Sequence, residues 1–316
     1  MLGSAHETGV RDVRPTATGP SFNIDAPPET ACDHPSSIAQ RGFHRASSRP
    51  AGETPRSRMT LVAITRAVSP ALTDCELTHL ERQPIDIARA TAQHASYEDA
   101  LRSLGIIVLR APAAPEQPDS VFVEDIALVL DEIAIITRPG APARRGEVAG
   151  VRETLAPYRP LLEMPAPATL DGGDVIRVGR RLIVGLSGRT NREGIDWLAV
   201  ALAPYGYAVS AQEFSGCLHL KSAATAIDDE TILLNPAWLP PAGIREFDCV
   251  SVDPDEPFAA NALRAGHTLL HGAQFPKTRA RLLARGLDVL PVDCTELAKA
   301  EGAVTCCSIL FHAHTA

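Results

Sequence analysis

The chain has 316 residues, a net charge of −8 at neutral pH, 45% hydrophobic residues and 22% charged residues. Such values are typical of a soluble globular protein with one large domain or two small ones. The acidic balance argues against a nucleic-acid partner, and no apolar run is long enough to span a bilayer. Seven cysteines without a framework spacing favour reduced thiols and a cytoplasmic setting.

Residues 1–58 are predicted to be a disordered extension, because they are rich in Pro, Ser, Thr, Gly and Arg and show no apolar period. Residues 1–20 contain no apolar segment of the kind that a secretion signal requires. Met59 directly precedes the first strand, so the extension is either genuine or an upstream start-site artefact. In both cases we expect the extension to carry no chemistry and residues 59–316 to form a single domain.

From residue 59 onward, short strands alternate with single helices. A strand is predicted over 60–66, then a helix over 85–104 that ends at Gly105, then a strand over 106–109. The later predicted elements are strands over 121–130 and 133–137, a helix over 147–158, strands over 175–178 and 182–186, a helix from Asn191 to residue 203, strands over 208–211, 219–227 and 231–235, a helix over 277–284, and strands over 287–292 and 308–311.

The order strand, strand, helix, strand recurs along the chain, although no sequence identity links the repeated units. Such repetition indicates small blades set around an axis. A generic α/β sandwich has the same order of elements, and the pattern alone leaves both architectures open.

Three carboxylates stand close together in the run Asp119-Ser120-Val121-Phe122-Val123-Glu124-Asp125. Read as a strand, the run points Asp119 and Asp125 to one face and Phe122 and Glu124 to the other. Val121, Phe122 and Val123 require burial on both faces, so a solvated charged surface fits poorly. Buried acids need a cationic or hydrogen-bonding partner, and the cluster therefore predicts a pocket for a small cation.

Cys306 is a candidate nucleophile near the other end of the chain, within Thr305-Cys306-Cys307-Ser308. Buried cysteines are commonly inert core residues, so the pair by itself decides nothing. A thiol that faces an acidic pocket for cations is nevertheless suited to attack a positively charged carbon, and guanidinium is the biological example.

Three other motifs are each weak alone. Gly172-Gly173 allows a sharp turn between Asp171 and Asp174, or belongs to a plain loop. His219 is either a structural histidine, an acid/base catalyst, or half of a zinc site with Cys217 on the same strand face, for which no second pair is evident. The arginines of Arg144-Arg145 and of Ser187-Gly188-Arg189-Thr190 belong to the surface or bind a substrate carboxylate.

Taken together and in this order, the motifs resemble those of the dimethylarginine dimethylaminohydrolase family, within the guanidino-group-modifying superfamily. The resemblance covers about residues 61–311 and excludes the N-terminal extension. The matching segments are residues 118–125, 136–142, 144–145, 169–175, 184–187, 189–191, 218–222 and 305–308.

The resemblance implies a five-bladed α/β-propeller of ββαβ units with pseudo-fivefold symmetry. It implies hydrolysis of Nω-methylated arginines to citrulline and mono- or dimethylamine through a covalent cysteine-thiouronium intermediate. The implied partner is a small cationic amino acid; no metal, no organic cofactor, no nucleic acid and no membrane is expected, and a homodimer stays open.

Carried over position by position, the resemblance makes Cys306 the nucleophile, His219 the general acid/base and Asp171 the acid that holds the histidine and the guanidinium. Glu301 departs from the family, in which Asp commonly precedes the glycine. The implied substrate-binding residues are Asp119, Glu124 and Asp125 for the guanidinium, Phe122 as the wall beside it, Arg144 and Arg189 for the α-carboxylate, Leu77 in a lid loop, and the carbonyl of Ala300 for the α-amino group.

Two kinds of alternative remain. An arginine deiminase or another guanidine hydrolase uses the same chemistry, although arginine deiminases usually carry a helical insertion for which this core has no room, and amidinotransferases pass the amidino group to an amine. In a non-catalytic protein, zinc would be held by Cys217, His219, Cys306 and Cys307.

Overall fold

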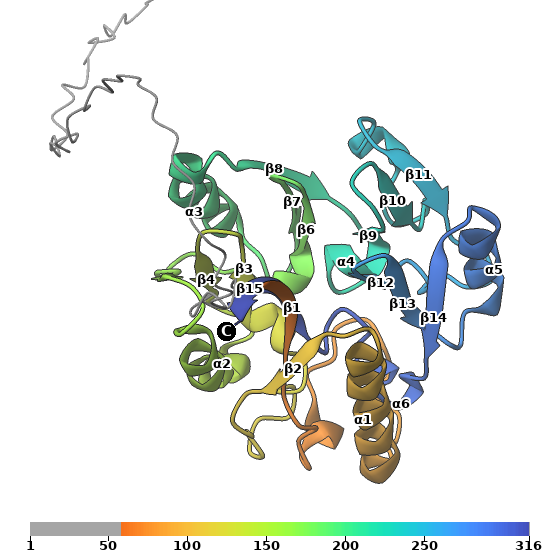
Figure 1. The fold of residues 1–316 in the computed structure, drawn as a ribbon, viewed down its shortest axis with the longest axis horizontal. Helices are drawn as coiled ribbons and strands as arrows, with labels where there is room; N and C mark the ends of the chain where they lie inside the picture. Colours follow the sequence, from red (N-terminus) through yellow and green to blue (C-terminus); the bar gives the residue numbers. More distant parts are fainter. Residues whose placement is uncertain (1–57, 316) are drawn as a thin grey trace, which may run out of the picture. The chain divides into compact units, whose positions relative to one another are not determined.

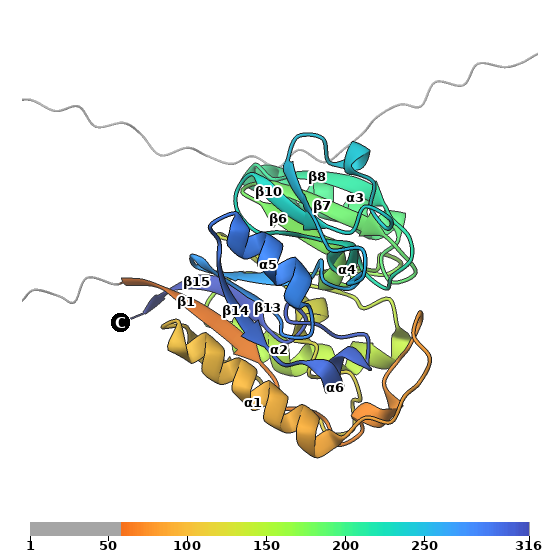
Figure 2. The same cartoon turned by 90° about the vertical axis from the view of Figure 1, so that its right-hand side faces the viewer.

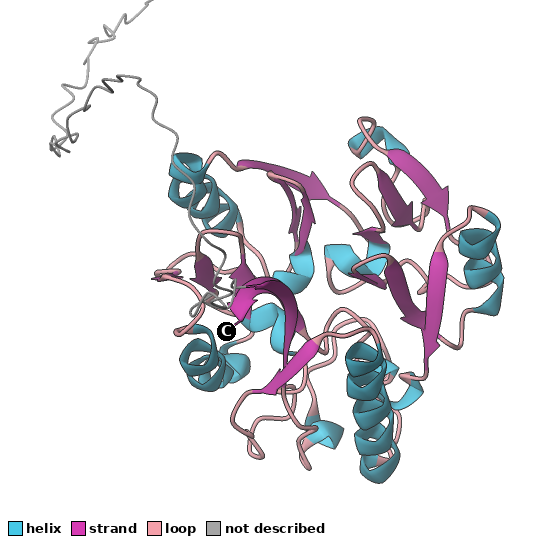
Figure 3. Ribbon diagram, in the orientation of Figure 1, coloured by secondary structure: helices cyan, strands magenta, loops and turns pink. Residues whose placement is uncertain are grey.

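The computed structural model describes residues 58–315, which belong to one compact unit. The predicted N-terminal extension, residues 1–58, lies outside the described residues except for Arg58, which begins the first strand. The fold is mixed α/β, with short sheets and helices alternating along the chain (Figures 1 and 3). Within residues 58–315, no helix has the length and apolar composition needed to cross a membrane.

The strands of the described part form five three-stranded sheets with one internal order: a first strand runs antiparallel to the central strand, and the third runs parallel to it. From first to third strand, the sheets are β15 (Ile309–Thr315), β1 (Arg58–Thr65) and β2 (Ile107–Arg110); β3 (Ala127–Val129), β4 (Ala134–Ile136) and β5 (Leu161–Glu163); β6 (Val175–Val178), β7 (Arg181–Leu186) and β8 (Ala208–Glu213); β9 (Ala224–Ala226), β10 (Thr231–Leu234) and β11 (Asp248–Ser251); and β12 (Ala262–Ala265), β13 (Thr268–Gly272) and β14 (Asp288–Val292).

A helical crossover joins the central strand to the third strand in each sheet, as parallel pairing requires. Asp86 and Asn191 cap two of these helices by accepting from Arg89 N and Gly194 N, which confirms the predicted cap at Asn191. Gly105 ends the first helix with a φ of 77°, also as predicted. The crossovers are α1 (Ile87–Ser103), η3 (Pro142–Glu147) with α2 (Val148–Leu155), α3 (Arg192–Leu202) with η5 (Ala203–Tyr205), η6 (Pro241–Gly243), and α5 (Pro276–Ala284).

The hydrophobic core lies between neighbouring sheets rather than in one central layer. Val62 of β1 packs in a cluster with Val129 of β3, and each further pair of successive sheets shares a cluster of the same kind. The last cluster returns to the first sheet, because it joins Leu270 of β13 and Val292 of β14 to Ala63 of β1. Helix α1 covers this closing cluster and contacts β2, β14 and α6 (Thr295–Ala298; Figure 2).

The short segments between sheets meet near the middle of the unit in Figure 1, where α4 (Leu220–Ala223) lies. Among them, η4 (Gly172–Asp174) contacts both η2 (Val123–Ile126) and α4. Each segment directly precedes the first strand of its sheet, so the repeated topology delivers residues that are far apart in sequence to one place. The remaining short helix, η1 (Leu72–Asp74), follows β1.

Two predicted strands are wrong at the ends that lead into this region. Residues 121–130 form a strand only over Ala127–Val129, because Val123–Ile126 is a 3-10 turn. Residues 219–227 form α4 followed by the strand Ala224–Ala226, so His219 and Cys217 share no strand face. The strands β5, β11, β12 and β13 were not predicted.

Gly194 tests the packing of α3. A Cβ at this position would lie 2.1 Å from the carbonyl oxygen of Thr169, which is backbone and has little room to move. We expect Gly194→Ala to lower the free energy of unfolding by about 1–3 kcal/mol, even though alanine favours helix by about 1 kcal/mol. Gly188→Ala is the matched control, because a Cβ there meets nothing within 4 Å. Urea denaturation of both variants measures the difference; equal stability would contradict this packing.

Candidate active site

A cavity of about 310 Å³ lies where the short segments meet. Eight of the residues predicted from the sequence line it, and four further lining residues were not predicted, namely Glu76, Leu218, Glu301 and Gly302. The eight are Asp119, Phe122, Asp125, Arg144, Arg189, His219, Ala300 and Cys306. The cavity therefore combines a thiol, an imidazole, carboxylates and guanidinium groups.

Three predicted residues do not line this cavity. Asp171 is fully buried behind His219 and contacts it directly. Glu124 lines a different cavity, together with Lys221 and Thr305. Leu77 is half-buried and packs against the core cluster beside α1, one residue after the lining residue Glu76.

His219 stands between two carboxylates. Its Nε2 lies 3.1 Å from Asp171 Oδ2, and its Nδ1 lies 3.8 Å from Asp125 Oδ1, which is beyond hydrogen-bond distance. Burial lowers the pKa of His219, but Asp125, Asp171 and Asp174 outweigh it and raise the pKa to about 9. The imidazole is therefore protonated at neutral pH, and its Nδ1 faces Asp125 from beyond hydrogen-bond distance.

Asp125 is the carboxylate that joins the two sides of the cavity. Its Oδ2 accepts from Arg144 Nη1 at 2.6 Å, and its Oδ1 accepts from Gly173 N at 2.9 Å. Burial raises the pKa of Asp125, but the charges of His219 and Arg144 with these hydrogen bonds lower it to about 2. A Cβ on Gly173 would lie 2.6 Å from His219 Nδ1, so only glycine lets the three groups approach.

Arg144 directs most of its N–H donors to other groups of the protein. Besides Asp125, it binds both carboxylate oxygens of Glu147 at 3.1 and 2.9 Å and the carbonyl oxygen of Phe122 at 3.0 Å. Its guanidinium is buried, and the neighbouring acids outweigh burial and raise its pKa. Arg144 is thus part of the wall that holds Asp125 and Phe122 in place.

Arg189 is the less committed of the two arginines. It is half-buried, and its Nη2 donates to Thr78 Oγ1 at 3.3 Å. On the same side of the cavity, Asp119 Oδ2 accepts from Glu76 N at 3.1 Å, and burial raises the pKa of Asp119 while Arg144 lowers it. The cavity therefore has a half-buried cationic side chain beside a buried carboxylate.

Cys306 lies above a polar network that Glu124 organises. Glu124 N donates to the carbonyl oxygen of Cys306 at 3.2 Å, and the Glu124 carboxylate accepts from Lys221 Nζ at 2.6 Å and from Thr305 Oγ1 at 2.7 Å. Burial, together with the charges of Glu124 and Asp125, raises the pKa of the Cys306 thiol. The neighbouring Cys307 is buried in the core.

Glu301 has an unusual backbone and an organising role. It has a φ of 57°, rare for a residue other than glycine, and its carboxylate accepts from the backbone N–H groups of Thr78, His79 and Leu80 at 2.5 to 3.2 Å. These bonds hold the loop after η1 against the cavity. Glu301 in place of Asp therefore preserves a defined loop, because the side chain reaches three donors.

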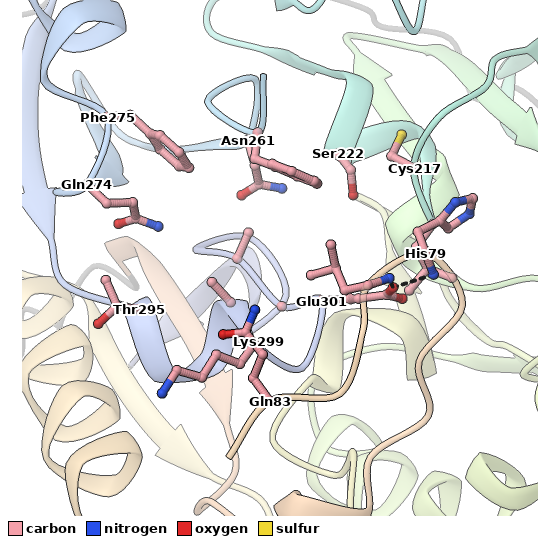
Figure 4. Close-up of a pocket in the computed structure, with 16 residues that line it drawn as sticks. His79, Gln83, Cys217, Ser222, Asn261, Gln274, Phe275, Thr295, Lys299 and Glu301 are labelled. Atoms are coloured by element: carbon pink, nitrogen blue, oxygen red, sulfur yellow. Dashed lines mark hydrogen bonds between the residues drawn. The ribbon is translucent and has the colours of Figure 1, made fainter. Parts of the chain in front are cut away.

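A second cavity of about 970 Å³ lies on the other side of Glu301 (Figure 4). It shares Leu218, Glu301 and Gly302 with the first cavity and is larger, but it contains neither Cys306 nor His219. Its wall is mostly apolar. The smaller cavity is the candidate active site because the reactive and charged groups converge there.

One group of side chains in the described residues has metal-ligand spacing, and it consists of Asp125, Asp171 and His219. His219 already hydrogen-bonds Asp171, and the two carboxylates already accept from Arg144 and from the backbone N–H groups of Gly173 and Gly140. The zinc site considered from the sequence would instead use Cys217, whose thiol donates to the carbonyl oxygen of His219 and which lines the second cavity. Over residues 58–315, no metal-like cluster includes a cysteine.

The residues that the sequence did not reveal are mostly supports. Glu147 and Arg66 hold Arg144 and its loop, since Arg66 Nη2 donates to the carbonyl oxygen of Glu147 at 2.9 Å. Neither residue stands in a motif. Glu301 was visible only as a departure, and Lys221 only as a motif member.

Comparisons with known proteins agree with this site. The sequence model of the arginine deiminase family matches residues 159–267. The N(G),N(G)-dimethylarginine dimethylaminohydrolase of Streptomyces coelicolor is 41% identical over 249 residues, which cover 78% of this chain and 95% of that protein. The Pseudomonas aeruginosa enzyme of the same name is 33% identical over 228 residues, covering 72% of this chain and 90% of that protein.

The solved structure of a Pseudomonas aeruginosa mutant complexed with citrulline superimposes with a TM-score of 0.77. It is 32% identical, and the match covers 80% of this chain and all of that chain. Identity and coverage are high for both relatives, and the fold agrees along the whole solved chain. This chain therefore belongs to the dimethylarginine dimethylaminohydrolase family.

Proposed function

We propose that this protein hydrolyses Nω-methylated arginines, namely asymmetric dimethylarginine and monomethylarginine, to citrulline and di- or monomethylamine. The observation that carries the proposal is one cavity that combines Cys306 and His219 with the acids Asp119 and Asp125. The family relatives and the citrulline complex of the Pseudomonas aeruginosa enzyme support it.

The acids account for binding of the substrate cation. The planar guanidinium docks against Asp119 and Asp125, with the ring of Phe122 beside it and Asp171 one layer behind. A guanidinium charge also favours the thiolate of Cys306, because an opposite charge within a few ångströms lowers a thiol pKa. The free site does the reverse, since burial and nearby acids raise the pKa of Cys306.

The reaction then proceeds in two displacement steps. The Cys306 thiolate attacks the central guanidinium carbon, a C–S bond forms, and the resulting tetrahedral adduct loses the methylated amine as His219 gives that nitrogen a proton. The product of this step is a thiouronium. Water attacks the same carbon while neutral His219 takes its proton, the C–S bond breaks, and citrulline leaves with the thiolate restored. Asp171 keeps the imidazole oriented in both steps.

The amino-acid end of the substrate lies at the other side of the cavity. Arg189 is suited to grip the α-carboxylate because it has few bonds to the protein, and Arg144 stands on the same wall. The carbonyl of Ala300 is proposed to meet the α-amino group, with Leu77 in the loop that Glu301 holds. Glu124 does not line this cavity; its backbone N–H donates to the carbonyl oxygen of Cys306.

Three further proposals concern the fold, the extent of the catalytic domain and the cellular location. We propose that the five sheets are the blades of a five-bladed α/β-propeller, supported by their common strand order and by core clusters that join each sheet to the next. We also propose that residues 59–316 are the catalytic domain. The protein is proposed to act in the cytoplasm, without metal, organic cofactor, nucleic acid or membrane.

A side-by-side assay of citrulline formation from asymmetric dimethylarginine, monomethylarginine and arginine tests the activity. We expect the methylated substrates to be turned over with higher kcat/KM than arginine. Preference for arginine would favour a deiminase, the activity of the family whose model matches residues 159–267.

Cys306→Ser should abolish turnover, because a hydroxyl is a far weaker nucleophile. Cys307→Ser serves as the control, and wild-type turnover by Cys306→Ser would exclude the covalent scheme.

The pH dependence follows from the raised pKa values of Cys306 and His219. At neutral pH the free site holds a thiol and an imidazolium, while attack needs the thiolate, so kcat/KM should rise with pH up to about 9.

Alkylation of Cys306 by iodoacetamide in the free enzyme should rise about tenfold per pH unit from pH 6 to 8. Peptide mass spectrometry, with Cys306→Ser as background, isolates this thiol. A plateau below pH 8 would show a low-pKa cysteine instead.

The two arginines should give different defects when each is replaced by leucine. Arg189→Leu should raise KM for monomethylarginine at least tenfold and leave the free energy of unfolding nearly unchanged, because few protein bonds are lost. Arg144→Leu should instead lower stability by about 3–5 kcal/mol, because it leaves Asp125 and Glu147 buried without their partner. Steady-state kinetics and urea denaturation separate the two; a stable Arg144→Leu protein would contradict its place in the wall.

A further inference from the structure

Asp174 is a fully buried carboxylate that neither lines the cavity nor takes part in the reaction as described. Its Oδ2 accepts from Ser187 Oγ at 2.6 Å and from Thr190 Oγ1 at 2.7 Å. Its Oδ1 accepts from Leu220 N at 2.9 Å. Three donors from two other segments thus converge on one side chain in η4.

Both hydroxyls in this network have their direction imposed by backbone donors. Ser187 Oγ accepts from Arg189 N at 3.0 Å and from Thr190 N at 3.1 Å. Thr190 Oγ1 accepts from Asp171 N at 3.1 Å. Since a hydroxyl has one proton, each of these protons is directed to Asp174. The network therefore requires an acceptor-only group at position 174, which is an ionised carboxylate.

The far ends of the network are three residues of the proposed mechanism. Leu220 is the residue after His219, Ser187 holds the backbone of Arg189, and Thr190 holds the backbone of Asp171. We propose that Asp174 is a positioning residue that sets the imidazole of His219, its partner Asp171 and the carboxylate-binding Arg189 relative to one another. This inference rests on the proposed function for the roles of those three residues.

Asp174 also adds negative charge near the imidazole. The groups facing His219 are Asp125 from η2, Asp171, Asp174 from η4, and Cys306 across the cavity, with Arg144 behind Asp125. Asp174 is among the acids that raise the pKa of His219 to about 9. Burial raises the pKa of Asp174 itself to about 6, so it is ionised at neutral pH and loses that charge in acid.

The space around Asp174 is closed to larger groups. A Cβ on Gly185 would lie 2.9 Å from Asp174 Oδ1, so glycine is needed where β7 passes the carboxylate. Asp174→Asn preserves the size of the side chain but replaces one acceptor oxygen with an NH₂ donor. In one orientation the NH₂ group faces Ser187 Oγ, which already accepts two backbone bonds, and in the other it faces the donor Leu220 N, so the network cannot form as it stands.

The decisive experiment compares Asp174→Asn with the wild type by NMR titration of the His219 imidazole and by the pH dependence of kcat. We expect the pKa of His219 to fall by roughly one unit, because one nearby negative charge is removed. We also expect kcat to fall at least tenfold because Asp171 and His219 lose their register. Glu256→Gln is the matched control. Glu256 is a buried carboxylate that accepts from Lys277 N and Thr278 N, and it does not line the cavity.

If Asp174→Asn does not fold, two variants that each remove one hydroxyl of the network still test the inference. Ser187→Ala should raise KM through Arg189 and leave the His219 titration unchanged. Thr190→Val should lower kcat, and Thr190→Ser should restore it, because serine keeps the bond to Asp171 N. Folded variants with wild-type kcat, KM and His219 pKa would overturn the role of Asp174. A wild type without turnover would sink the proposed function, whereas the titration would still decide whether Asp174 acts on His219.

Discussion

The site depends on one buried charge arrangement, in which Asp125 stands between the guanidinium of Arg144 and the imidazole of His219. An isolated carboxylate at this depth would cost several kcal/mol, and it is tolerated because Arg144 and Gly173 N bind its two oxygens. Asp125 in turn raises the pKa of His219, so the buried imidazole is held as a cation. Asp125 and His219 therefore stabilise each other's charged form, and Arg144 stabilises the carboxylate.

The fold explains how that set can be assembled from distant parts of the chain. In the sheets, the segment that leads into the first strand lies near the middle of the unit. Short segments with 3-10 or one-turn helical geometry are suited to this position, since they turn side chains in several directions within a few residues. The clusters between sheets bury the apolar side chains elsewhere, which leaves the middle free for polar groups.

The sequence predicted the chemistry of the site better than its local geometry. Helix ends with specific caps, such as Asn191 and Gly105, were predicted correctly because the cap residue itself carries the signal. The acids of residues 119–125 were assigned to a strand because apolar and polar residues alternate there, whereas the chain forms a turn and a 3-10 segment. Tertiary contacts, above all Arg144 on the carbonyl of Phe122, override the pattern. Supports such as Glu147 have no local signature, because their role exists only through a partner.

The position of Glu124 shows how the site separates binding from activation. Glu124 is next to Asp125, but the 3-10 turn directs it away from the cavity to Lys221 and Thr305, which neutralise and bind it. Its backbone N–H fixes the carbonyl of Cys306, while its charge opposes thiolate formation. A free thiolate would be exposed to oxidation and alkylation at any time. A cysteine that becomes nucleophilic only when a cation enters confines its reactivity to the bound substrate, and burial with the charges of Glu124 and Asp125 imposes that condition.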